Sequence, residues 1–125
     1  MDVPRFLVIA VDHPSLEGSV EAFLDELRDE QRFFGRRSSS CRKPFPSLIE
    51  RLGDRRTMRL GVLHAHRVIA MASVDNDGAV ALAVAADFRR QGVGDQLMAV
   101  LTDRAAAIGY PPLHRFTARR VRLAG

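Results

Sequence analysis

The chain has 125 residues, of which 46% are hydrophobic and 27% charged, so it can form one packed domain over residues 1–125, and wholesale disorder is excluded. No apolar run approaches the roughly 20 residues of a membrane-spanning helix, and the N-terminus lacks a signal-peptide pattern, which predicts a cytoplasmic protein without membrane association. The single cysteine, Cys41, excludes a disulfide framework. The net charge is +4 and eighteen of the 19 basic residues are arginine, which suits phosphate binding but also fits a codon bias, so charge alone assigns no function.

The first half of the chain predicts one strand and two helices. Residues 5–10 are a short apolar run typical of a strand, and apolar residues then recur at helical spacing over about 16–28. The polar and basic stretch 35–43 predicts a mobile loop. A second short helix follows over 46–52 and is closed by Gly53.

The middle of the chain predicts a three-stranded meander. Residues 57–63 alternate in polarity, 64–66 form a tight turn, and 67–74 pair back as a second strand. The sequence DNDG at 75–78 is a strong hairpin signal, and the continuous apolar run 79–85 predicts a buried third strand.

The last third predicts a helix and a strand. Apolar residues on one helical face extend from 92 to 108, where Gly109 ends the helix and two prolines prevent its continuation. Residues 113–118 predict a final strand, after which only seven residues remain.

The turn between the strand 79–85 and the following helix carries the strongest functional signal. Two arginines, Arg89 and Arg90, precede two glycines, Gly92 and Gly94, and the helix begins there. A strand that ends in such a turn presents several backbone N–H groups and the positive end of a helix dipole to one concavity. Glycines let a phosphate approach the backbone, and the arginines add full charges. The pattern therefore predicts a pyrophosphate site.

Residues 89–97 do not match either of two common phosphate-binding motifs. A P-loop requires a lysine and a hydroxyl residue after its last glycine, and Gly94 is followed by neither. A dinucleotide-binding fingerprint requires a third glycine at position 97, which is leucine.

The pattern [R/Q]-x-x-G-x-[G/A] fits residues 89–94 and resembles the acetyl-CoA-binding motif of the GNAT N-acetyltransferase superfamily. The element order matches over about residues 5–118, although Ala86 stands where the family often has proline.

The resemblance implies an α/β fold of the α+β type, with a mixed, mainly antiparallel central sheet flanked by helices. It also implies that acetyl-CoA is the cosubstrate and that no metal is required. Backbone groups of Leu82 and Val84 would pair with the pantetheine arm, although any core strand looks like this one. The implied cofactor-binding residues are Leu82, Val84, Arg89, Arg90, Gln91, Gly92, Val93, Gly94 and Asp95. The Asp95 side chain is interpreted as pointing away and stabilising the helix.

The sequence offers two candidate catalytic bases. The strand 79–85 has no titratable side chain, so the candidate bases are Asp75, which also suits a hairpin turn, and Glu50 on the second helix. Tyr110 does not match the family's tyrosine position and is interpreted as a packing residue. His64 and His66 lack a third metal ligand.

Three functions compete. The first is transfer of acetyl from acetyl-CoA to a primary amine, and the second is a non-catalytic acyl-CoA-binding remnant or regulatory module. The third, nucleic-acid binding, would use Arg36, Arg37, Arg42, Arg119, Arg120 and Arg122, but the sequence lacks interleaved aromatics or a known nucleic-acid motif. Because the family continues past its fifth strand, the chain is expected to be shortened at its C-terminus, and an uncovered sheet edge would favour a homodimer.

Overall fold

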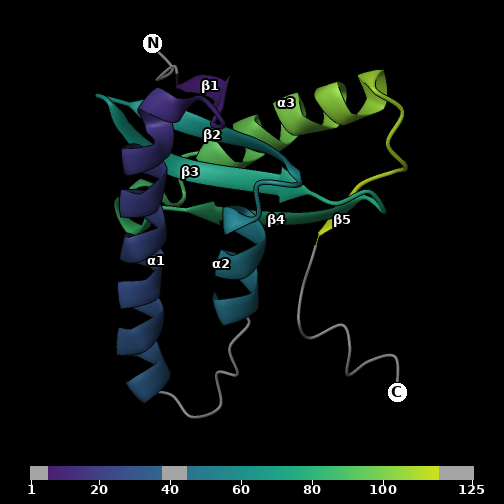
Figure 1. Ribbon diagram of the computed structural model, residues 1–125. Helices are drawn as coiled ribbons and strands as arrows, with labels where there is room; N and C mark the ends of the chain where they lie inside the picture. The colour runs from purple at the N-terminus through teal and green to yellow at the C-terminus, as the bar shows by residue number, and fades with distance from the viewer. Residues whose placement is uncertain (1–5, 38–44, 116–125) are drawn as a thin grey trace, which may run out of the picture.

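The computed structural model describes residues 6–37 and 45–115 (Figure 1). Cys41, residues 116–118 of the predicted last strand and the arginine-rich tail lie outside the described residues, as does the predicted C-terminal shortening. In chain order the elements are β1 (Leu7–Ala10), the one-turn helix η1 (Pro14–Leu16), α1 (Glu17–Arg37), α2 (Phe45–Gly53), β2 (Met58–His64), β3 (Arg67–Val74), β4 (Ala79–Val84), the one-turn helix η2 (Ala86–Phe88), α3 (Val93–Ala107) and β5 (His114–Arg115).

The first helix is longer than the sequence predicted. Its apolar side, formed by Val20, Phe23, Leu24 and Leu27, is buried against the sheet, as the helical spacing indicated. The helix does not end near residue 28 but continues to Arg37, so residues 35–37 are helical rather than part of a loop. The extension places further acidic residues on a helix surface, which matters for the site below.

The sheet has the order β1-β2-β3-β4-β5. Its first three pairings are antiparallel, and β5 pairs in parallel with the start of β4. The turn between β2 and β3 consists of two residues, Ala65 and His66, whose φ angles of +51° and +66° are both left-handed. Such a turn matches the twist of the two strands it joins. The predicted mainly antiparallel meander is confirmed.

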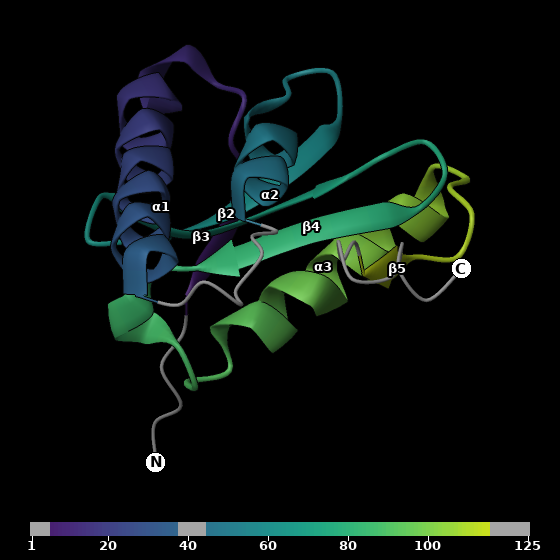
Figure 2. The same cartoon turned by 90° about the horizontal axis from the view of Figure 1, so that it is seen from below.

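The helices cover the sheet from both sides. Figure 2 shows α1 and α2 on one face and α3 on the other. Strand β3 lies in the middle, and its residues Val68 to Val74 are all buried. The predicted mixed fold with flanking helices is therefore confirmed, and β4 delivers the chain directly to the turn before α3.

Candidate phosphate-binding site at the start of α3

The segment between β4 and α3 adopts a tight and locally strained conformation. After η2, Arg90 has a φ of +64°, and Gly92, which caps the start of α3, has a φ of +82°. Left-handed backbone costs an L-residue roughly 1–2 kcal/mol, whereas glycine adopts it freely. Backbone conformation therefore favours glycine at position 92, whereas Arg90 adopts the left-handed conformation at an energetic cost.

The turn leaves a run of backbone N–H groups without an internal acceptor. No side chain caps α3, and the first backbone bond at its start runs from the N–H of Gln96 to the carbonyl of Gly92, at 3.0 Å. Within the described residues, the N–H groups of 91–95 donate to no protein atom. Unbonded N–H groups at and just before the positive end of a helix are typical of anion-binding sites.

The second glycine has a different role from the first. A Cβ at Gly94 would lie 3.4 Å from Cδ2 of Leu82 and 3.7 Å from Cγ2 of Val84, which are ordinary contacts. Gly94 has helical backbone and packs the first turn of α3 against β4. Alanine would fit there, in agreement with the glycine-or-alanine alternative of the sequence pattern.

Arg89 does not lie free beside the turn, as the sequence analysis expected. Its two terminal nitrogens donate to the carboxylate of Glu30 on α1, at 2.6 and 2.7 Å, and its Nε donates to the carbonyl of Val84, at 2.8 Å. The Glu30 carboxylate, bonded to the guanidinium, raises the pKa of Arg89 above its usual range. The longer α1 brings Glu30 to this place, so the guanidinium that was expected beside a phosphate is bound to a carboxylate of the protein.

Arg90 is the arginine that remains available. Its side chain is exposed and forms no hydrogen bond or ion pair with any residue that the structure describes. Asp95 is exposed as well and does not cap the helix, which agrees with its interpretation as an outward-pointing acid in the first turn. Of the two neighbouring arginines, one supports the fold and the other faces solvent.

The backbone of β4 is open on the side away from β3. Asp75 N–H donates to Ala79 and Ala85 N–H donates to Ile69, at 3.0 and 2.7 Å, so the odd-numbered residues of β4 bond to β3. Because strand groups alternate, Leu82 and Val84 point their backbone groups to the other side. In the described residues β5 pairs only with the first two residues of β4, and the Val84 carbonyl is occupied by Arg89.

The two candidate bases lie on different elements. Asp75, in the hairpin between β3 and β4, forms an ion pair with Arg51 of α2, which fastens the hairpin to that helix. Asp77 accepts a hydrogen bond from the N–H of Ala79 at 3.2 Å, a contact typical of an aspartate in a hairpin turn. Glu50 is exposed on α2. Tyr110 packs, half-buried, against the core, as predicted.

A second arginine, Arg67, also joins α1 to the segment before the turn, and the sequence analysis did not identify it. It donates to Glu26 on α1 and to Asp87 in η2, with contacts from 3.1 Å. The Arg67 guanidinium lowers the pKa of Asp87 and lies 5.7 Å from the ring centre of Phe88. Glu26 and Glu30 are four residues apart, a spacing that could have revealed a shared helix face had the helix been extended.

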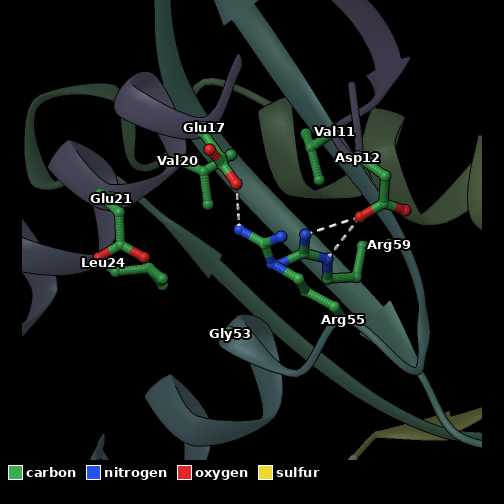
Figure 3. Close-up of a pocket in the computed structure, with 9 residues that line it drawn as sticks. All are labelled: Val11, Asp12, Glu17, Val20, Glu21, Leu24, Gly53, Arg55 and Arg59. Atoms are coloured by element: carbon green, nitrogen blue, oxygen red, sulfur yellow. Dashed lines mark hydrogen bonds and ion pairs between the residues drawn. The ribbon is translucent and has the colours of Figure 1, made fainter. Parts of the chain in front are cut away.

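A cavity of about 290 Å³ lies away from this turn, between α1, the end of β1 and the end of α2 (Figure 3). Its charged groups are largely paired with one another. Arg59, whose side chain is only 4% exposed, donates to Asp12 at 2.6 Å and to the carbonyl of Leu52 at 3.0 Å. Arg55 donates to Glu17 at 2.5 Å. These contacts join β1, β2 and both helices of this face.

The described residues were also compared with the requirements of a metal site and of a membrane-spanning helix. No group of three or more potential metal ligands occurs among the described residues. The exposed His64 lies in an aromatic cluster, with its ring centre 5.1 Å from that of Phe88. None of the helices in the described ranges is both long and apolar enough to cross a membrane.

A mixed sheet that delivers β4 into a glycine turn with unbonded amides defines an α/β fold with a candidate anion site at the start of α3. The model of the acetyltransferase (GNAT) family matches residues 20–119, and the chain belongs to this family. No curated protein matches the sequence.

Solved structures with the same fold include several acetyltransferases. A transcriptional regulator from Bacillus halodurans C-125 aligns with a TM-score of 0.62 and 15% identity, covering 96% of this chain and 89% of that one. A ribosomal-protein-alanine N-acetyltransferase from Brucella melitensis biovar Abortus 2308 aligns at 0.54 and 16%, covering 97% and 87%. An aminoglycoside N-acetyltransferase in complex with CoA aligns at 0.55 and 13%, covering 96% and 88%. At such low sequence identities, the structural similarity shows that this chain has the same fold as these proteins.

Proposed function

We propose that this protein transfers an acetyl group from acetyl-CoA to a primary amine. The observation that carries the proposal is the run of N–H groups at 91–95 without internal acceptors, at the start of α3. A pyrophosphate there accepts hydrogen bonds from these amides and meets the positive end of the helix dipole. Arg90, which has no partner in the described residues, adds the counter-charge.

The remaining parts of the cofactor follow from the open side of β4. The N–H and carbonyl of Leu82 and the N–H of Val84 point away from β3, and an extended pantetheine arm has the amides to pair with them. Family membership and the fold shared with a CoA complex support the same cofactor. No step of this proposal requires a metal.

The proposed acceptor is a primary amine. Related folds include an enzyme for aminoglycosides and one for ribosomal-protein alanine, so both kinds of amine belong in a first panel. Asp75 and Glu50 are the proposed proton acceptors. Because Asp75 is held by Arg51, Glu50 is the freer of the two carboxylates.

Two observations favour a second function, a non-catalytic acyl-CoA-binding module. Strand β4 carries no titratable side chain, and Asp75 has a structural ion pair. A thiol-release assay with acetyl-CoA and the amine panel separates the two functions. Turnover that is lost in Glu50→Gln supports the enzyme, CoA binding without turnover on any amine supports the module, and absence of CoA binding contradicts both.

The proposal also includes a homodimer, which analytical ultracentrifugation would test. A sedimentation coefficient of a monomer at all concentrations would contradict it.

A further inference from the structure

Side chains of α1 and of the segment that leads into the turn before α3 line a common cavity. A cavity of about 270 Å³ lies between the helix and the segment that leads into the turn. It is lined by Glu26, Leu27, Glu30, Arg67, Ala85, Ala86 and Asp87. The turn itself contains two left-handed residues, Arg90 and Gly92. Left-handed backbone at a non-glycine residue such as Arg90 persists only where its surroundings hold it, so contacts around the turn must support this conformation.

Arginine side chains supply that support by crossing the gap. Arg89 binds both carboxylate oxygens of Glu30, whose side chain is only 15% exposed, and its Nε binds the carbonyl that ends β4. A two-point contact between guanidinium and carboxylate fixes orientation as well as distance. Arg67 makes a second and more exposed connection, from Glu26 to Asp87.

We infer that Glu30 is a positioning residue for the cofactor: through Arg89, it holds the turn so that the amides of 91–95 face one anion. The inference rests on the proposed function and deepens it. Arg89 acts on the pyrophosphate indirectly, through the backbone that it fixes. Arg90 is the guanidinium that meets the phosphate.

A direct contact between Arg89 and the phosphate would have the opposite effect on ligand affinity when Glu30 is replaced. If Arg89 leaves Glu30 to contact the phosphate itself, Glu30 competes with the ligand, and removing its charge tightens binding. If Glu30 positions the turn, removing its charge weakens binding. The sign of one mutational effect therefore decides between them.

The experiment titrates CoA and, separately, inorganic pyrophosphate into the ¹⁵N-labelled full chain and follows the amide signals of Gly92 and Gly94. Variants are Glu30→Gln, Arg89→Ala and the double variant. Glu21→Gln is the matched control, because Glu21 is exposed on the same helix and has no hydrogen bond or ion pair in the described residues. Thermal unfolding of each variant verifies that it is folded at the titration temperature.

We expect Glu30→Gln to weaken both ligands by about five- to tenfold, as for loss of one charge-assisted contact. Arg89→Ala weakens them at least as much, and the double variant is no weaker than Arg89→Ala, because both residues act as one unit. Glu21→Gln leaves both affinities unchanged. A purely structural role lowers the unfolding temperature and leaves the affinities of the folded variants equal to that of the wild type.

Tighter binding by Glu30→Gln, or affinities equal to those of Glu21→Gln, overturns the inference. Failure of the proposed function has a different signature. A wild type that binds pyrophosphate but not CoA contradicts the acetyl-CoA assignment while the positioning role of Glu30 is still decided by pyrophosphate. A folded wild type that binds neither ligand overturns both.

Discussion

The turn before α3 and the cavity between α1 and α2 both gather arginines, but their polar groups are satisfied in different ways. In the cavity, Arg59 and Arg55 bind carboxylates and a carbonyl of the protein itself (Figure 3). At the turn, the amides of 91–95 and the side chain of Arg90 have no partner in the described residues. Polar groups without internal partners suit an external ligand, whereas paired groups stabilise the fold.

The largest expected effect tests the cavity as a structural region. Arg59→Ala removes hydrogen bonds to Asp12 and leaves the Leu52 carbonyl without its donor in a buried place, so we expect the free energy of unfolding to fall by about 2–4 kcal/mol. Chemical denaturation measures this change. Arg55→Ala, which removes an exposed pair, is the control and leaves stability nearly unchanged.

Arg59→Ala also separates the two regions. If they differ as described, the folded variant binds CoA with the affinity of the wild type. A large loss of CoA affinity without loss of fold would place the ligand in the cavity instead.

The second prediction compares the two glycines of the turn. Gly92→Ala forces a side chain into left-handed backbone and lowers the free energy of unfolding by about 1–2 kcal/mol, with weaker CoA binding because the amides move. Gly94→Ala is the matched control, since its Cβ meets only ordinary contacts and its backbone is helical. Denaturation and calorimetry measure both. Equal losses at the two positions would refute a conformational role specific to Gly92.

A third, smaller effect concerns the free guanidinium. Arg90→Ala weakens CoA binding by about three- to tenfold, because one solvent-exposed charge-assisted contact is lost. Arg104→Ala, which removes a charge from the far end of α3, serves as the control. Calorimetry at two salt concentrations measures the CoA affinity of both proteins. We expect the affinity of the wild type to fall more with added salt than that of Arg90→Ala. An unchanged affinity in Arg90→Ala would remove this residue from the site.

The smallest expected effect is on a pH titration. Arg67 holds the pKa of Asp87 below its ordinary value, so the stabilisation from this pair is present above a pH of about 4 and is lost as the pH falls through the lowered native pKa. In Arg67→Ala the pKa of Asp87 rises toward its ordinary value, because the hydrogen bond and the charge that lower it most are removed. A ¹³C NMR titration of the carboxyl measures it. An unchanged Asp87 pKa in the variant would contradict the pairing that connects η2 to β3.

The glycine turn could be predicted from neighbouring residues, but the contacts of its arginines with α1 could not. Gly92 and Gly94 could be assigned from the sequence because the strand end, the glycines and the helix start are neighbours along the chain. The sequence placed Arg89 at the phosphate. Its contact with Glu30 could not be predicted, because Glu30 is 59 residues away and lies beyond the predicted end of α1. The ends of helices depend on packing that propensity does not record.

The burial of Arg59 shows the same limit in the other region. Its position in an alternating strand was compatible with an exposed side chain. Its burial follows from the end of α2, whose Leu52 carbonyl needs a donor, and from Asp12 after β1. Three elements meet at this arginine, and the sequence alone gives no sign of that meeting.

The most direct test of the account is a titration of CoA into the ¹⁵N-labelled wild type. We predict saturable changes in the amide signals of 91–95, with the signals of Val11 and Gly53 at the cavity unchanged. Changes confined to the cavity, or none at the turn at saturating CoA, would contradict the central claim that the free amides at the start of α3 hold the cofactor.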